Sequence, residues 1–255
     1  MYWIGTCGWE YPHWRAVLYP SSLPRRAWLS HYSTKFPAVE IDTTFYGLPH
    51  EPVIRHWAEL TPPTFRMAIK ASRYLTHVRH LHDPDALRRL AAAIEPLGPR
   101  RGPLLLQLPA TARADLDALA RVLSVANDLA WPVVLEGRHP SWLTKECTAV
   151  LCAYNATQCW TGWRGRVSPQ SPGASWGYVR LHAGRAHPTG AYGHRALVSW
   201  AARLVHAYEH AADVYVMFNN DAHGCAPHNA ALLTRLVRDL GGVVAPASAN
   251  ATLMG

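Results

Sequence analysis

The sequence has few charged residues and lacks any long apolar run. Only 16% of its 255 residues are charged and 49% are hydrophobic, so its composition excludes a disordered chain. No apolar stretch approaches the roughly 18 residues of a transmembrane helix, and the opening "MYWIGTCGWEYP" lacks a basic region followed by an apolar one. We therefore expect no membrane span and no export signal, and we expect a cytoplasmic protein.

Paired cysteine motifs are also missing. The five cysteines are odd in number and show no CxxC spacing, so we expect free thiols and no zinc knuckle. Cys7 follows the first predicted strand and could act as a nucleophile near His77 or His182. A lone cysteine for which the sequence places no base is more often inert.

No basic run marks a nucleic-acid tail. The formal net charge is +8 and the pI is near 9.5, which favours anionic partners. The excess is nevertheless scattered over pairs such as Arg25-Arg26, Arg88-Arg89 and Arg100-Arg101.

Short apolar runs alternate with segments of helical period from end to end, as in βα units around a parallel sheet. The length and the lack of a linker favour one α/β domain over residues 1–255, a single (β/α)₈ TIM-like barrel with 241–255 as its tail. The predicted strands are 3–5, 38–42, 66–71, 104–108, 132–136, 158–161, 178–182 and 214–219. The predicted helices are 26–36, 53–60, 84–95, 116–127, 142–154, 194–210 and 229–240.

The sixth unit departs from this pattern. Its segment "TGWRGRVSPQSPGAS" supplies loop residues without a helical period. We therefore predict that the sixth helix is missing or replaced by a long loop. The tail "GGVVAPASANATLMG" is small and uncharged, so we expect it to pack loosely.

Polar residues gather where the predicted strands end. Because residues two apart share a face of a strand, Glu40 and Asp42 lie together, and Tyr178, Arg180 and His182 form another series. The same alternation turns Lys70, Gln107, Glu136, Asn219 and Asp221 toward the barrel interior. The residues that this alternation turns toward the helices are Val39, Ile41, Ile69, Leu106, Leu135, Val179 and Leu181.

The carboxyl ends of barrel strands are where active sites lie in this fold. Burying Lys70, Arg180, Glu40 and Glu136 is costly unless they pair, and ionisable groups gathered in a cleft usually mark a site. Other roles stay open for single residues. Asn219 and Asn220 are also common turn formers, Gln107 could satisfy a backbone group, and Tyr178 could be ordinary core.

The segment "YVMFNNDAHGCAPHNA" combines a buried strand with a dense polar cluster. Alternation predicts that Asn219, Asp221 and His223 face the barrel mouth, whereas Asn220 braces a neighbouring loop. We place His228 and Asn229 at the start of the final helix, where Pro227 suits the first turn.

Seven segments resemble, in order, landmarks of the domain-of-unknown-function 72 family, also called YecE-like: "IGTCGWEYPHW", "FPAVEIDTTFYGLP", "FRMAIKASRYLTH", "PLLLQLP", "LEGRHPSW", "GYVRLH" and "YVMFNNDAHGCAPHNA". The likeness covers residues 4 to about 240 and implies a TIM-like barrel similar to xylose isomerase-type and apurinic-endonuclease-type barrels, with no firmly established general activity. The family segments supply Glu40, Lys70, Gln107, Glu136, Arg138, His139, Arg180, His182, Asn219, Asn220 and Asp221.

Three departures from the family pattern indicate that this member's ligand differs. The family usually has Asn where this chain has Asp42 and commonly Ser in place of Cys7. Its sixth segment is often longer and ends in Asp, where this chain has "CWTGWRG".

Our first hypothesis is an enzyme that uses acid/base chemistry on a small anionic or polar substrate, without metal or cofactor. Glu136 or Glu40 would accept a proton, and Lys70 and His182 would act as donor or electrophile. Arginine forks suit a carboxylate or a phosphate, and hydrolysis, isomerisation and elimination all stay open. The expected substrate contacts are Asp42, Tyr46, Gln107, Arg138, His139, Tyr178, Arg180, Asn219, Asn220, Asp221 and His223.

Two other functions are kept as alternatives. The basic charge and the resemblance to apurinic-endonuclease barrels allow a nucleic-acid binder or a repair-like hydrolase, and a non-catalytic protein that binds a small anion is the third possibility. We predict no metal, because Lys70 and Arg180 would repel a cation. The ligands that could gather around one are Glu40, Asp42, Glu136, His182, Asp221 and His223.

Overall fold

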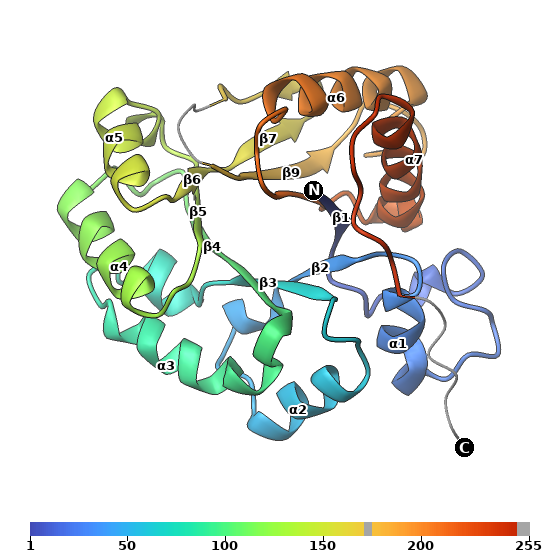
Figure 1. The fold of residues 1–255 in the computed structure, drawn as a ribbon, viewed down its shortest axis with the longest axis horizontal. Helices are drawn as coiled ribbons and strands as arrows, with labels where there is room; N and C mark the ends of the chain where they lie inside the picture. The colour runs from blue at the N-terminus through green and yellow to red at the C-terminus, as the bar shows by residue number, and fades with distance from the viewer. Residues whose placement is uncertain (171–174, 249–255) are drawn as a thin grey trace.

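The computed structural model describes residues 1–170 and 175–248, and its strands form a curled parallel sheet with helices outside it (Figure 1). The order of neighbouring strands is β6-β5-β4-β3-β2-β1-β10-β9-β7-β8. The parallel strands are β1 Tyr2–Cys7, β2 Ala38–Ile41, β3 Arg66–Lys70, β4 Arg101–Leu108, β5 Val133–Gly137, β6 Thr157–Gln158, β7 Trp160–Trp163, β9 Gly177–Ala183 and β10 Val214–Phe218.

The sheet closes through a divided sixth strand. β6 pairs with β5, β7 pairs with β9, and only Cys159 separates β6 from β7. The predicted strand 158–161 is therefore two short strands, each of which serves one neighbour. Counted as one, β6 and β7 complete eight parallel strands, and the predicted TIM-like α/β fold is confirmed.

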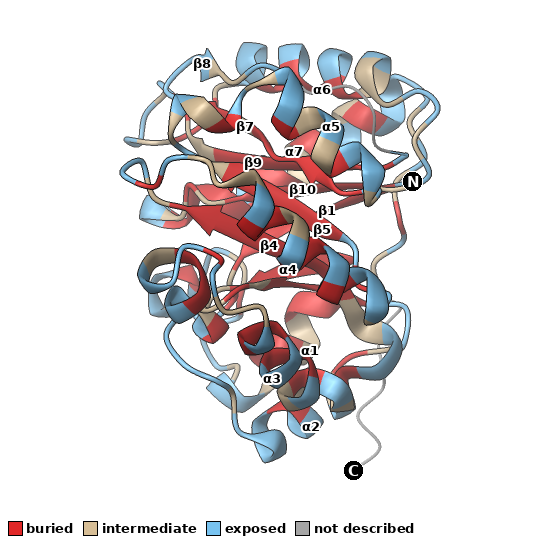
Figure 2. Ribbon diagram, turned by 90° about the vertical axis from the view of Figure 1, so that its left-hand side faces the viewer, coloured by how far each residue is buried: buried red, intermediate tan, exposed pale blue. Residues whose placement is uncertain are grey.

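Helices cover the outside of the sheet, and their outward faces are exposed (Figure 2). They are α1 Trp28–Ser33, α2 Glu51–Glu59, α3 Asp85–Ile94, α4 Leu116–Asp128, α5 Lys145–Ala153, α6 His194–Ala207 and α7 Cys225–Asp239. The connections contain 3₁₀ turns at η1 Pro12–Trp14, η2 Arg25–Ala27, η3 Thr43–Phe45, η5 Glu95–Arg100, η6 Pro140–Trp142 and η7 Ala222–Gly224, and a π-helical turn at η4 Tyr74–Val78.

Several helix boundaries differ from the sequence prediction. The first helix begins at Trp28 instead of residue 26, because the preceding residues form the 3₁₀ turn η2. The fifth begins at Lys145 instead of residue 142, where the hydroxyl of Thr144 caps it by accepting the amide of Cys147. The last begins four residues early, at Cys225, so Pro227 lies in its first turn as expected.

No helix occupies the described part of the sixth connection, as predicted, but it contains a hairpin instead of only a loop. Strand β8, Arg166–Val167, pairs antiparallel with β7 across the two-residue turn Arg164-Gly165. Both turn residues have positive φ, 47° and 78°, which is the signature of the tight turn that best matches strand twist. Residues 171–174 of the predicted loop and 249–255 of the predicted tail lie outside the described residues.

The strands have two different buried faces, and the predicted alternation is confirmed for both. The residues turned toward the helices are in the main apolar core, as predicted for Val39, Ile41, Ile69, Leu106, Leu135, Val179 and Leu181. A second cluster fills the barrel interior: Trp3, Cys7, Ala38, Ala68, Leu105, Val134, Cys159, Trp176, Tyr178, Tyr215, Met217 and Ala245.

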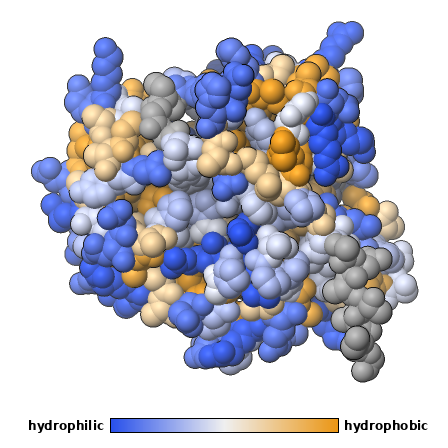
Figure 3. Space-filling view, in the orientation of Figure 1, coloured by the Kyte–Doolittle hydropathy of each residue, from blue (hydrophilic) through white to orange (hydrophobic). Residues whose placement is uncertain are grey.

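The molecular surface is mainly hydrophilic on the face shown in Figure 3, where hydrophobic side chains form small separate patches. Among the described residues, no helix combines the length and apolar character needed to cross a bilayer.

Candidate active site

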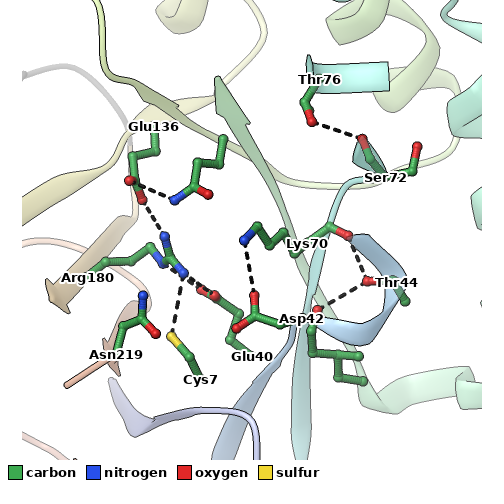
Figure 4. Close-up of polar contacts among 12 residues, drawn as sticks. Cys7, Glu40, Asp42, Thr44, Lys70, Ser72, Thr76, Glu136, Arg180 and Asn219 are labelled. Atoms are coloured by element: carbon green, nitrogen blue, oxygen red, sulfur yellow. Dashed lines mark hydrogen bonds and ion pairs between the residues drawn. The ribbon is translucent and has the colours of Figure 1, made fainter. Parts of the chain in front are cut away.

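Arg180 is the centre of a buried ionic network that joins three strands of the barrel (Figure 4). From β9, its Nη2 and Nε donate to the two carboxylate oxygens of Glu40 on β2, at 2.6 and 3.1 Å. Its Nη1 donates to Oε2 of Glu136 on β5 at 2.7 Å. All three side chains are almost wholly buried, so this network is a fixed part of the barrel wall.

The two glutamates of the network are held ionised. Burial, the largest influence, would raise both pKa values, but the charge of Arg180 together with the neighbouring hydrogen-bond donors and cations lowers both below the ordinary value. The hydroxyl of Tyr178 also donates to Glu40 at 2.7 Å, and the Gln107 amide donates to Glu136 at 2.9 Å. Carboxylates with such low pKa values and so many donors are weak proton acceptors.

The outer oxygen of Glu136 connects the network to the barrel mouth. Arg138 Nε lies 3.2 Å from Glu136 Oε1, and His182 Nε2 lies 3.3 Å from the same oxygen. The other ring nitrogen of His182 contacts the Asn219 amide nitrogen at 3.1 Å. The structure thus brings Arg138, His182 and Asn219 beside one fixed negative charge.

Asp42 and Lys70 form a second pair beside the network (Figure 4). Asp42 follows the end of β2, and its Oδ1 lies 3.6 Å from Lys70 Nζ at the end of β3. Lys70 also lies above the ring of Phe45, with 4.4 Å between Nζ and the ring centroid. Within the described residues, Oδ1 of Asp42 is buried without a hydrogen-bond partner.

The carboxyl of Asp42 titrates near neutral pH. Burial, followed by repulsion from the charge of Glu40, raises the pKa of Asp42 to about 7, and the attraction of Lys70 offsets this only in part. The Asp42 side chain nevertheless remains 30% exposed. Of the carboxylates around Arg180, Asp42 is therefore the one able to exchange a proton at physiological pH.

A cavity of about 620 Å³ opens at the carboxyl ends of β5, β7 and β9. Arg138, 49% exposed, supplies a guanidinium at its edge. Cys159, Thr161 and Trp163 were not predicted as site residues, although their spacing of two along an extended segment places them on one face. The cavity is lined by Glu136, Gly137, Arg138, Leu143, Gln158, Cys159, Thr161, Trp163, Ser168 and His182.

Some predicted site residues contact other parts of the mouth. Asp221 accepts a hydrogen bond from the indole of Trp14 and lies 3.1 Å from His13, so it joins the last loop to the first. His139 accepts the amide hydrogen of Ser141 at the start of η6.

Three further candidates lie around the rim. Asn220 donates to the Gly190 carbonyl and to Asn229, which is the predicted bracing contact. Tyr46 is 84% exposed and packs edge-on against Phe45. His223 is an exposed residue of η7.

The side chains of Cys7, Glu40 and Asp42 offer donor atoms within 4.8 Å of one another, so we tested them as metal ligands. Arg180 lies 2.6 Å from Glu40 and 3.7 Å from the Cys7 sulfur, and Lys70 adjoins Asp42. These cations oppose a metal ion. Burial and the charge of Glu40 raise the pKa of the Cys7 thiol well above its usual value, which also argues against a nucleophilic thiolate.

Comparison with known proteins gives family matches without an assigned activity. The model of the family described as "Protein of unknown function DUF72" matches residues 3–252. The protein YecE of Escherichia coli K12 is 34% identical over 148 residues, 57% of this chain and 51% of YecE, so the chain spans about half of that relative. YunF of Bacillus subtilis is 24% identical over 93% of this chain and 95% of its own.

Solved structures support the fold. A DUF72 family protein from Thermotoga maritima superposes with a TM-score of 0.80 at 23% identity, covering 93% of this chain and 99% of the other. The structure of SacUVDE has a TM-score of 0.55 at 8% identity, covering 95% of this chain and all of the other.

Proposed function

Because the chain belongs to the DUF72 family of proteins of unknown function, we propose its function from the geometry of its own site. The proposal is an enzyme that carries out acid/base catalysis on a small polar or anionic substrate at the barrel mouth. The observation that carries it is Asp42, a carboxyl with a pKa of about 7 whose buried Oδ1 lies 3.6 Å from the ammonium of Lys70 and has no hydrogen-bond partner among the described residues.

The buried network supports this role by fixing charge. Glu40 lies two residues before Asp42 on β2, and its permanent negative charge disfavours ionisation of Asp42. Arg180 holds Glu40 in place and keeps it ionised. We therefore assign Glu40 and Glu136 to positioning and transfer the proton-accepting role, which the sequence had suggested for them, to Asp42.

Cationic groups at the mouth would bind and polarise the substrate. Lys70 Nζ adjoins Asp42 and is placed to stabilise negative charge that develops where Asp42 removes a proton. Arg138 and His182 line the cavity across the mouth, held by Glu136 Oε1. A substrate that reaches from this cavity to Asp42 would contact an anion clamp, an imidazole and an acid/base carboxyl.

The test is an activity screen of the wild type and of Asp42→Asn. Hydrolysis is followed with nitrophenyl phosphates, acetates and glycosides, and proton abstraction is followed as deuterium exchange into hydroxy and keto acids. The variant should lose at least about a hundredfold in rate, since general acid/base groups supply about 10²–10⁴. Asp239→Asn, an exposed substitution on α7 with the same charge change, is the control and should keep full rate.

The wild-type rate should also change with pH near 7. An active Asp42→Asn enzyme with the wild-type pH profile would refute the assignment of Asp42. A ligand that binds at the mouth without turnover in any assay would favour a non-catalytic anion-binding protein.

A further inference from the structure

A second cavity, of about 580 Å³, adjoins the mouth and is lined by arginines. Trp163, 52% exposed, lines both this cavity and the one at the mouth. The two spaces therefore meet at the indole. The cavity is lined by Trp163, Arg164, Arg166, Gly184, Arg185, Ala186, His187, Thr189 and Gly190.

The backbone that carries these arginines is fixed by hydrogen bonds. The amide of Arg164 donates to the carbonyl of Ala183 at 2.6 Å, which ties the β7–β8 turn to the end of β9. Arg185 Nε donates to the carbonyl of Arg164 at 2.7 Å. Gly165 packs against this guanidinium so closely that a Cβ there would lie 2.9 Å from Arg185 Cζ. The cavity wall is thus built into the sheet.

The charge of this cavity is not balanced within the described residues. Arg164, Arg166 and Arg185 are exposed, and no described carboxylate forms an ion pair with any of them. By contrast, Arg88 and Arg89 on α3 pair with aspartates. Three unpaired guanidinium groups around one concavity create a positive potential that attracts an anion.

We propose that the arginine cavity binds the phosphate group of a small phosphorylated substrate, whose remaining part passes Trp163 into the mouth cavity. This assignment rests on the proposed function, because it names the substrate class of the same site. Guanidinium forks match phosphate oxygens, and three cations suit a dianion better than a single carboxylate. The guanidinium carbon of Arg164 lies 5.8 Å from the Trp163 ring centroid. The indole ring would therefore lie between the phosphate group of the substrate and the part of the substrate that reacts at the mouth.

A small molecule fits these observations better than a nucleic acid. A nucleic acid requires a basic track along many phosphates, whereas these arginines line one concavity between the β7–β8 turn and the 184–190 loop. The arginine pair of α3 lies on an outer helix and is paired with aspartates. A single-stranded oligonucleotide therefore serves as the competing probe.

The experiment is isothermal titration of the wild type, Arg166→Gln and Arg185→Lys with five probes: inorganic phosphate, glycerol 3-phosphate, glycerol, malonate and a short oligothymidylate. Arg121→Gln, an exposed substitution on α4 with the same charge change, is the matched control. Melting temperatures show whether each variant is folded. Glycerol 3-phosphate should bind at least about tenfold more tightly than glycerol or malonate, and Arg166→Gln should weaken it about tenfold, whereas Arg121→Gln should not.

Each other outcome overturns the proposal. The phosphate subsite is refuted if glycerol 3-phosphate binds equally to the wild type and Arg166→Gln, or if it binds no more tightly than malonate. It is also refuted if glycerol 3-phosphate does not bind at millimolar concentration. Binding of the oligonucleotide alone, lost in Arg166→Gln, would identify a nucleic-acid surface instead. Titration measures binding without turnover and the Asp42→Asn activity screen measures turnover, so failure of the arginine cavity and failure of Asp42 catalysis are separate results.

Discussion

Glu40 on β2 and Asp42 just beyond the end of β2 are two residues apart, and their carboxyl groups differ in protonation. Glu40 accepts three hydrogen bonds, from Tyr178 and twice from Arg180, and its pKa is lowered. Asp42 is buried and is repelled by Glu40, and its ion pair with Lys70 is longer, at 3.6 Å, so its pKa rises to about 7. Neighbouring carboxyls with opposite shifts are a general arrangement for acid/base work.

This arrangement predicts how Asp42 affects stability. Its folded pKa, about 7, exceeds the unfolded value of roughly 3.9, so ionisation opposes folding increasingly as pH rises from about 4 to above 7. Asp42→Asn should therefore be more stable than the wild type at pH 9, by about 2 kcal/mol after allowance for partial exposure, and about equal below pH 4. Urea denaturation across this pH range measures the difference, with Asp239→Asn as control. A destabilised variant at pH 9 would contradict the raised pKa.

Arg180→Met should destabilise the fold by about 3–5 kcal/mol, because it leaves Glu40 and Glu136 buried and unpaired. Adding Glu40→Gln and Glu136→Gln should recover part of the loss. Arg138→Met removes an arginine that is half exposed and should cost less than about 1 kcal/mol. Denaturation curves measure the free energy of unfolding of these variants. An Arg180→Met variant as stable as the wild type would show that Arg180 is not a structural partner of the glutamates, and would favour the role of substrate clamp.

Sequence alternation predicted which residues face the barrel interior, but not their protonation. Period two fixes the side of a strand and placed Glu40, Glu136 and Arg180 correctly inside. Distances of 2.6 and 3.6 Å decide which carboxyl is ionised, and these depend on how strands far apart in the chain align. For that reason, the difference in pKa between Glu40 and Asp42 could not be predicted from the sequence.

At the scale of secondary structure, the sixth unit shows which structural features the local sequence pattern did not predict. Its lack of helical period predicted correctly that no ordinary helix occurs in the described part of this connection. The hairpin itself was missed, although Arg164-Gly165 between Trp163 and Arg166 has the length and the second-position glycine of a tight turn. The division at Cys159 could not be predicted, because it results from pairing with two different neighbours during closure.

Gly165→Ala tests whether this turn positions the arginine cavity. Alanine is strained at φ 78°, and its Cβ would displace the guanidinium of Arg185. We expect a loss of about 1–2 kcal/mol in stability together with weaker binding of glycerol 3-phosphate. Gly241→Ala, which lies outside the arginine cavity, supplies a control, since its φ is also positive but a Cβ there meets no atom within 4 Å. Equal phosphate affinity in the two variants would show that the turn does not shape the cavity.

Over the whole molecule, the barrel interior changes character along its axis. Trp3 and Tyr178 both stack against Tyr215, with ring centroids 6.0 Å apart in each pair, and so fill part of it with aromatic rings. Arg180 lies two residues beyond Tyr178 on β9 and begins the ionic layer. The apolar part is solid core, while the ionic part holds the charges that the mouth chemistry requires.

The ionic layer also predicts acid sensitivity of the fold. The folded pKa of Glu136 is well below the unfolded value of roughly 4.3, so its stabilising contribution is complete above that value and is lost as pH falls through the folded pKa. Glu136→Gln should be about 3 kcal/mol less stable than the wild type at pH 7, and this gap should narrow toward pH 3. Urea denaturation at several pH values tests it, with the exposed substitution Glu209→Gln as control. A gap independent of pH would contradict the lowered pKa.

The carboxyl of Asp42 can be observed directly by carbon-13 NMR. Its side-chain carboxyl resonance is assigned by its absence in Asp42→Asn and is followed from pH 3 to 10, in the wild type and in Glu40→Gln. The proposed acid/base role predicts a midpoint near 7 in the wild type and a lower one in Glu40→Gln, where the repelling charge is gone. A wild-type midpoint near 4, the ordinary value for an aspartate, would contradict it.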